Sequence, residues 1–253
     1  MKTLLLAALV FTTSMITDLS AEDTKLYELR IYHASPGKLD ALHSRFRDHT
    51  CALFEKHGMK QIGYYVPVEN EDNILVYWLS YSDEEARNKA WKGFRDDPEW
   101  KAAYAASTKD GKLVEKVDSI FLRATDYSPE IGMLINKDDS RLFEWRTYTT
   151  NEGKLPNLHA RFRDHTCALF KKHGMTNLAY WGYNKGADGD TTTLTYIIAH
   201  KDKATRDASF DGFRNDPDWH AARDASEKDG KILIKGGVKT TFLKPTDYTP
   251  TKD

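Results

Sequence analysis

The sequence carries almost no net charge, because 37 Lys and Arg residues are balanced by 38 Asp and Glu residues. Without a basic excess, binding to nucleic acid or to an anionic membrane has no electrostatic driving force. Two cysteines among 253 residues are too few for a disulfide-based fold. The composition, with 40% hydrophobic and 30% charged residues, is that of a globular protein. It excludes a disordered chain, a fibrous chain and a polytopic membrane protein.

Long hydrophobic runs are also missing, apart from a short one close to the N-terminus. Residues 4–11 are all apolar, follow Lys2 and are too few to span a bilayer. Small residues ending at Ala21 then precede an acidic pair, an order typical of a cleavable export signal. We therefore predict a signal peptide over residues 1–21, the alternative being a first helix of the fold. The mature chain is expected in the periplasm or outside the cell, with no integral membrane segment.

The most informative feature is an internal repeat. RFRDHTCALF occurs at 45–54 and again at 161–170, and 22 of 33 positions are identical between 27–59 and 143–175. Two copies are too few for a solenoid, but they suit a unit that otherwise forms a twofold dimer. The predicted organisation is a first domain at 22–127, a linker at 128–140 and a second domain at 141–253.

Each copy predicts the element order βαββαβ, which is the ferredoxin-like arrangement. Strands are indicated by alternating β-branched and aromatic residues, and helices by their capping residues. Asp97-Pro98, for example, is typical of a helix start. In the first copy the predicted elements are a strand at 26–33, a helix at 38–57, strands at 61–68 and 74–81, a helix opening at 82–85, a short helix from 97 and a strand at 113–123.

These motifs resemble the NIPSNAP family. The resemblance rests on the strand YELRIY, the turn PGKL, the helix FRDHTCALFEKHGM and the segment GFRDDPEW, and it covers nearly all of 26–127 and 142–248. That family belongs to the dimeric α/β-barrel group, in which two ferredoxin-like units pair their sheets into a barrel with helices outside. The resemblance implies an α+β chain whose two tandem units form such a pseudo-dimeric barrel within one chain. It does not select an activity, because the group includes small monooxygenases and haem-binding proteins.

A polar row on the first strand of each copy is one candidate site. Glu28, Arg30 and Tyr32 share one face of the strand, and the second copy repeats all three. Lining a barrel interior, such a row would bind a polar or anionic group. The alternative is a structural ion pair with a tyrosine, or a solvated sheet face. The ligand-binding candidates here are Glu28, Arg30, Tyr32, Glu144, Arg146 and Tyr148.

The long helix of each copy offers a second candidate site. His43 lies one turn from Arg47, so both can touch one ligand, whereas Arg45 falls on the opposite face. A neutral imidazole beside an arginine could be an acid/base group, an oxyanion partner or an axial haem ligand. The alternative is a satisfied histidine of the core. For His57 and His173, next to the glycine that ends each helix, we predict a structural or helix C-terminal role. The catalytic candidates are His43 and His159, with ligand-binding candidates Arg47, Thr50, Arg163 and Thr166.

Signatures of other chemistry are missing from the sequence. It contains no HExxH, CxxC, GxSxG or Gly-rich phosphate motif, so no metal site is expected and no cofactor is identified. We predict an exported protein that binds a small, partly apolar or anionic ligand in a barrel pocket. Cofactor-light oxidation or isomerisation could follow in one of the two halves. The alternatives are a non-enzymatic protein-interaction module and, more weakly, a haem carrier; a homo-oligomer of the fused barrel is left open.

Overall fold

The computed structural model describes residues 25–137, 139–184 and 192–252, so the predicted signal peptide lies outside the described residues. The first half contains β1 (Leu26–Ala34), α1 (Leu39–Arg45), the π turn η1 (Phe46–Thr50), α2 (Cys51–Lys56), β2 (Lys60–Pro67), β3 (Ile74–Tyr81), α3 (Glu84–Asp96), α4 (Pro98–Ser107) and β4 (Val114–Ala124). The second half contains β6 (Leu142–Thr150), α5 (Leu155–Arg161), the π turn η2 (Phe162–Thr166), α6 (Cys167–Lys172), β7 (Thr176–Tyr183), β8 (Thr193–His200), α7 (Lys203–Asn215), α8 (Pro217–Ser226) and β9 (Leu233–Pro245). Two short strands, β5 (Ile135–Asn136) and β10 (Thr251–Lys252), pair in parallel outside the barrel.

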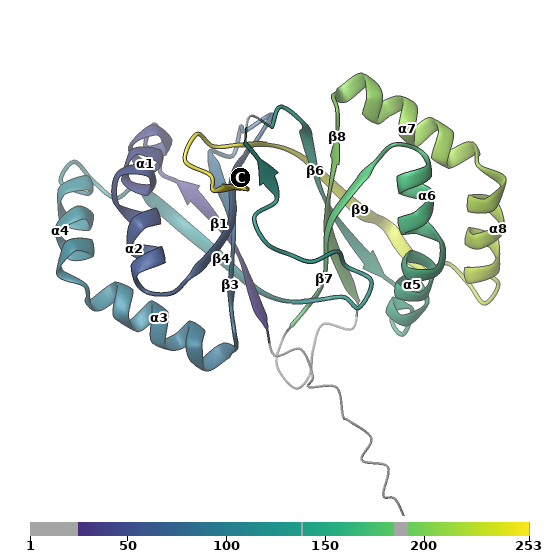
Figure 1. The fold of residues 1–253 in the computed structure, drawn as a ribbon, viewed down its shortest axis with the longest axis horizontal. Coiled ribbons are helices and arrows are strands. Elements are labelled where there is room, and N and C mark those ends of the chain that lie inside the picture. The colour runs from purple at the N-terminus through teal and green to yellow at the C-terminus, as the bar shows by residue number, and fades with distance from the viewer. Residues whose placement is uncertain (1–24, 138, 185–191, 253) are drawn as a thin grey trace, which may run out of the picture.

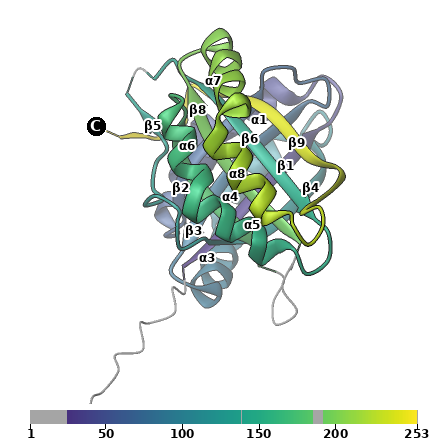
Figure 2. The same cartoon turned by 90° about the vertical axis from the view of Figure 1, so that its right-hand side faces the viewer.

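The main strands close into one antiparallel barrel, in the order β1-β3-β2-β9-β6-β8-β7-β4 (Figure 1). The two halves meet at two seams, β2 against β9 and β4 against β7. The helices of each half cover the outside of its own sheet, on opposite sides of the barrel (Figure 1). Figure 2 looks onto the helices of the second half, where α5 and η2 lie beside α8. The predicted α+β fold, two ferredoxin-like units forming an intrachain barrel, is confirmed.

The barrel interior is filled by apolar and aromatic side chains. Trp78 and Trp181 stack there, with ring centroids 6.1 Å apart and planes inclined by 12°. Tyr65 and Phe143 pack beside them and are fully buried. Strand alternation produces this interior, because each strand turns its apolar face inward and its mixed face toward the helices.

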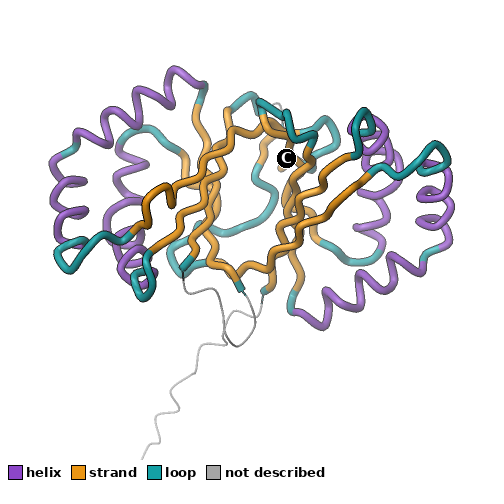
Figure 3. The backbone as a smooth tube through the Cα atoms, turned by 180° about the vertical axis from the view of Figure 1, so that it is seen from behind, coloured by secondary structure: helices purple, strands orange, loops and turns teal. Residues whose placement is uncertain are grey.

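The segment that joins the halves contributes to this interior. Ile131, Leu134 and Ile135 are buried among the barrel side chains, and the Leu134 amide donates to the Ile62 carbonyl at 3.4 Å. Figure 3 shows the loop running between the strands of the two halves. The predicted linker at 128–140 is therefore partly a plug of the barrel rather than an external connection.

The long helix of each half contains a π turn that the sequence did not predict. In the first half, the hydroxyl of Thr50 donates a hydrogen bond of 3.1 Å to the backbone carbonyl of Arg45, five residues earlier in the chain. The pair Thr166 and Arg161 repeats this bond at the same distance. The threonine hydroxyls, predicted to bind ligand, thus satisfy the backbone of the π turn and are buried.

The predicted starts of the outer helices are close to the observed ones. Asp83 caps α3 by accepting from the Ala86 amide, and Asp97 caps α4 by accepting from the Glu99 amide. Asp97 also binds His57 Nε2 at 2.7 Å, and Asp216 binds His173 at 2.6 Å. The structural role predicted for His57 and His173 is confirmed, since each ties its helix to the cap of the next.

Helix α3 passes so close to His57 that only glycine fits at position 93. A Cβ placed on Gly93 would lie 2.7 Å from His57 Nδ1. Alanine ordinarily stabilises a helix by about 1 kcal/mol relative to glycine. We expect Gly93→Ala to lower the melting temperature instead, because the methyl group displaces the imidazole from Asp97. In a His57→Ala background the same substitution should be neutral or stabilising; a higher melting temperature for Gly93→Ala alone contradicts this packing.

Candidate functional site

The polar row of β1 lies between the barrel and the helices, and not in the barrel interior that was one possibility for it. Glu28 is fully buried and Arg30 Nη1 donates to it at 2.6 Å. Arg87, on α3, adds two hydrogen bonds at 2.9 and 3.0 Å. The remaining donors to the Glu28 carboxylate are Tyr81, Trp91 and Ser119. Burial alone would raise the pKa of Glu28, but the Arg87 hydrogen bond and the charge of Arg30 outweigh it and lower the pKa to about 2.

The second half repeats this buried ion-pair cluster around Glu144. Arg146 and Arg206 both donate to the carboxylate, and His200 Nε2 lies 2.9 Å from it. The tyrosines of the row, Tyr32 and Tyr148, accept from the neighbouring arginine at 3.5 and 3.1 Å. In each half, the hydrogen bonds of the buried carboxylate are therefore made within the protein. For the six residues of this row, a structural ion pair with a tyrosine fits better than ligand binding.

The predicted catalytic histidines each bind a tyrosine supplied by the other half. His159 Nδ1 lies 2.8 Å from the hydroxyl of Tyr127, which follows β4, and His43 Nδ1 lies 2.7 Å from the hydroxyl of Tyr248, which follows β9. Sequence reasoning missed these two tyrosines as site residues. The signal was present in the repeated Thr-Asp-Tyr after the last strand of each copy.

The aspartates of the same motif bind the predicted ligand-binding arginines. Arg163 donates to both oxygens of Asp126 at 2.6 and 2.7 Å, and Arg47 donates to both oxygens of Asp247 at 2.8 Å. These ion pairs are largely exposed. The structure thus brings each His and Arg together as predicted, but each arginine already holds a carboxylate instead of facing an empty anion site.

Both histidines are held in the neutral form at pH 7. Burial lowers the pKa of His159, and the nearby positive charge of Arg163 lowers it further. Burial also lowers the pKa of His43, although the charge of Asp40 opposes this. A neutral imidazole with one nitrogen bound to a tyrosine hydroxyl can accept a proton at the other nitrogen. For His159, Nε2 has no hydrogen-bond partner among the described residues.

The two histidine sites differ in the residues beside them. A cavity of about 520 Å³ adjoins His159, and its lining residues are Arg123, Ala124, Thr125, Asp126, Pro156, His159, Arg163, Gly182 and Tyr183. Gly182 leaves open space where a side chain would stand, because nothing lies within 4 Å of a Cβ built there. The repeat places Val66 at the equivalent position of the first half, and Asp40 at the position of Pro156. The second half therefore combines the histidine with an accessible cavity.

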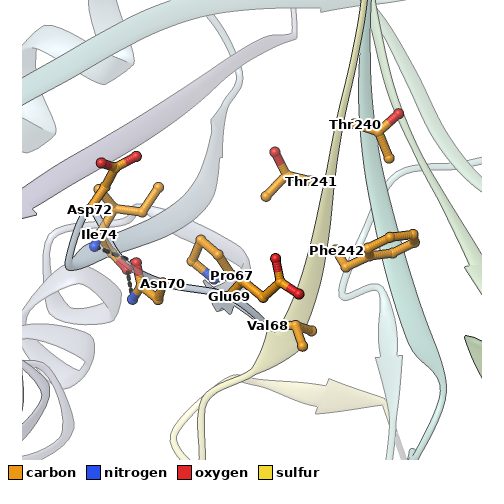
Figure 4. Close-up of a pocket in the computed structure, with 9 residues that line it drawn as sticks. All are labelled: Pro67, Val68, Glu69, Asn70, Asp72, Ile74, Thr240, Thr241 and Phe242. Atoms are coloured by element: carbon orange, nitrogen blue, oxygen red, sulfur yellow. Dashed lines mark hydrogen bonds between the residues drawn. The ribbon is translucent and has the colours of Figure 1, made fainter.

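Another cavity, of about 280 Å³, lies where the β2–β3 turn meets β9 (Figure 4). The Asn70 side chain closes the turn by hydrogen bonds to both backbone groups of Ile74, at 2.8 and 2.9 Å. The rim carries Glu69 and Asp72 but neither a histidine nor an arginine. This cavity therefore has no group suited to neutral-pH proton transfer, and it is separate from the His–Tyr pairs.

Cysteine and metal chemistry find no support in the described ranges. Burial raises the pKa of the Cys51 thiol to about 12 and that of Cys167 to about 11, so neither is a ready nucleophile. Nowhere in the described part of the chain do three or more His, Cys, Asp or Glu side chains come together as a metal ion would need.

None of the helices in those same ranges has the length and apolar character to cross a membrane.

The family model described as NIPSNAP matches the chain twice, at residues 27–129 and 143–250. No curated protein matches the chain. An uncharacterized NIPSNAP-like domain protein from Burkholderia xenovorans is 21% identical, with 47% of this chain and all of that chain covered and a TM-score of 0.40.

Two larger solved structures cover nearly the whole chain. A putative monooxygenase from Fusobacterium nucleatum is 13% identical over 90% of this chain and 95% of that chain, with a TM-score of 0.57. An anthrone oxidase-like protein is 11% identical over 92% and 95% of the two chains, with a TM-score of 0.59. At such identities the likeness concerns the fold alone, and it agrees with the closed barrel described above.

Proposed function

The chain belongs to the NIPSNAP family, and from this premise we propose that its second half binds a small, partly apolar or anionic ligand and transfers a proton at His159. The observation that carries the proposal is the cavity of about 520 Å³ beside a neutral histidine. The cavity wall offers the apolar surfaces of Ala124 and Pro156 and the positive charge of Arg123, while the charge of Arg163 is balanced by Asp126. That mixture suits an apolar body with one acidic or enolisable group.

The chemistry that this arrangement supports is removal of a proton from an acidic C–H bond. The step uses the tautomer in which His159 Nδ1–H donates to the Tyr127 oxygen, 2.8 Å away, so that Nε2 is free to accept the proton. In an isomerisation the same imidazolium returns the proton to a different carbon, so no co-reactant is needed. In an oxidation, dioxygen is the co-reactant: it adds to the carbanion, the resulting peroxide takes the proton from the imidazolium, and loss of water converts the original CH2 into C=O. Oxidation is included in the proposal because solved structures named as a putative monooxygenase and as anthrone oxidase-like share the fold.

The test compares the two histidines. Native mass spectrometry of the purified chain, with an absorbance spectrum, identifies a co-purifying ligand and reveals haem by its Soret band; without one, a panel of enolisable ketones and phenols serves as probes. We expect His159→Gln to reduce turnover about 100-fold or more, as loss of a general base typically does. His43→Gln is the matched control and should retain turnover. Equal losses in both variants, or none in His159→Gln, contradict the assignment.

A non-enzymatic interaction module is the second candidate. The filled barrel and the closed ion pairs around Glu28 and Glu144 favour it, because a rigid platform needs no internal space. The cavity beside His159 is the observation against it. Capture of a protein partner that persists in the His159→Gln variant, with no small molecule bound in either protein, would favour this candidate over the enzyme.

Export to the periplasm or beyond the cell is also proposed, and it rests on the apolar run and small residues within 1–21. The mass of the protein recovered from its native cell measures the cleavage directly. A mature chain that begins near residue 22 is expected, and a chain that retains Met1 or Lys2 contradicts export by this signal.

A further inference from the structure

Arg45, in the first half, is a buried arginine without a carboxylate partner in the described residues. Its residue surface is only 5% exposed, although the guanidinium is charged at every physiological pH. Its one hydrogen bond, from Nη1 to Ser107 Oγ, is 3.4 Å long, and Nε is buried without any partner. The rings of Trp100 and Tyr104 lie 5.3 and 5.5 Å away and attract the cation without neutralising it.

The second half shows how the same position is neutralised. Arg161 is equally buried and its Nε also has no partner, but its Nη1 lies 3.4 Å from Glu227 Oε1, and this carboxylate also binds Lys231. In the first half the repeat places Thr108 where Glu227 stands. Burying a charge without its counterion is costly. The second half supplies the anion from Glu227, whereas no described residue supplies one to Arg45.

A cavity of about 370 Å³ adjoins Arg45, in the groove between α1 and α4. Its lining residues are Ala41, Ser44, Arg45, Asp48, His49, Ala103, Ala106 and Ser107. The alanine methyl groups give an apolar wall, and the Ser44 hydroxyl can donate to a ligand oxygen, whereas the Ser107 hydroxyl donates to the Tyr104 carbonyl. Arg45 Nη2 makes no hydrogen bond to a described residue, so it is available to a ligand at this wall.

From this difference between the halves we propose that the groove between α1 and α4 binds a small organic carboxylate, whose charge replaces the missing glutamate at Arg45. A carboxylate matches the planar donors of a guanidinium, and the apolar remainder of the ligand lies against Ala41, Ala103 and Ala106. Asp48, at the exposed rim, repels anions, which favours a ligand with one negative charge over a phosphate with two. The site is distinct from the cavity at His159 and does not depend on its chemistry.

The experiment uses benzoate as the probe and follows the Arg45 Nε–H signal by ¹H–¹⁵N NMR. Chloride at the same ionic strength is the reference that removes general salt effects. In the unmodified protein we expect a saturable shift of the Arg45 signal with benzoate and no such shift with chloride. The Arg161 signal, whose counterion is Glu227, should stay in place. No saturable shift of the Arg45 signal overturns the proposal.

Two variants supply the controls, and neither alters the arginines. Thr108→Glu copies the second half, so we expect it to weaken benzoate binding about tenfold or more by placing a carboxylate beside Arg45. Glu227→Thr copies the first half and should make the Arg161 signal respond to benzoate as well. If Thr108→Glu keeps the benzoate affinity of the parent, benzoate does not bind at Arg45 and the proposal fails.

Discussion

Replacement of Glu28 by glutamine should destabilise the protein by about 3–5 kcal/mol, the range found when one partner of a buried ion pair is removed. The carboxylate is fully buried and accepts hydrogen bonds from Arg30 and from Arg87. Glutamine has nearly the same shape but no charge, and it must turn one amide NH₂ toward the arginine donors. Two cations would then stay in the cluster without their anion.

Urea unfolding at pH 7 measures this loss. Glu144→Gln is expected to cost a similar amount, because Arg146 and Arg206 surround Glu144 in the same way. Glu115→Gln, at an exposed pair with Lys112, is the control and should change stability far less than Glu28→Gln. A loss no larger than that of the control would show that the Glu28 cluster contributes little.

The same carboxylates predict how stability depends on pH. The pKa of both Glu28 and Glu144 is lowered to about 2, from an ordinary value of 4.5. Because the folded pKa is the lower one, their contribution is complete above pH 4.5 and is lost as the pH falls toward 2. The slope of unfolding free energy against pH between 4.5 and 2 should therefore be shallower in Glu28→Gln. An identical slope in variant and parent contradicts the lowered pKa.

The second large effect is expected from Gly182→Val, which should strongly weaken ligand binding in the second half while the fold persists. Gly182 lies on β7 beside Arg123 of β4, and a Cβ there meets nothing within 4 Å. A valine side chain would therefore extend into the cavity next to His159. Since valine is also a better strand residue than glycine, the melting temperature should be equal or higher.

The matched control uses the equivalent position of the other half. Val66→Gly removes the side chain that the first half carries there and should leave ligand binding at His159 intact. We expect Gly182→Val to weaken binding about tenfold or more, as a filled pocket would. Unchanged affinity in Gly182→Val, measured by calorimetry on a protein of parental stability, would place the ligand elsewhere.

The fold could be predicted from the sequence because the repeat and the strand alternation are local patterns. Twenty-two identities over one segment define two equal units, and apolar alternation on β1 indicates which residues share a face. Which face of a strand points into the barrel cannot be predicted from local sequence, because it is set by how the whole sheet closes. Tyr27 and Leu29 point into the barrel, whereas Glu28 faces α3. The buried position of Arg45 escaped prediction for the same reason, because α4 covers a helix face that looks polar in isolation.

Only the part of the candidate site that lies on one helix could be predicted from the sequence. His159 and Arg163 are one helical turn apart, so their proximity follows from helix geometry. Their partners Tyr127 and Asp126 come from the other half, across a seam that no sequence spacing encodes. The π turn also lay beyond prediction, since its extra residue leaves the hydrophobic pattern of the helix almost unchanged.

The most direct test of the central claim, a single working pocket at His159, is a map of ligand-induced backbone shifts in ¹H–¹⁵N NMR spectra. The two halves provide an internal comparison, because Gly182 and Val66 occupy equivalent positions. On titration with the ligand or probe that binds, we predict the largest shifts at Gly182, Arg163 and Ala124, with little change around Val66. Equal shifts in both halves, or shifts confined to other surfaces, would contradict the claim.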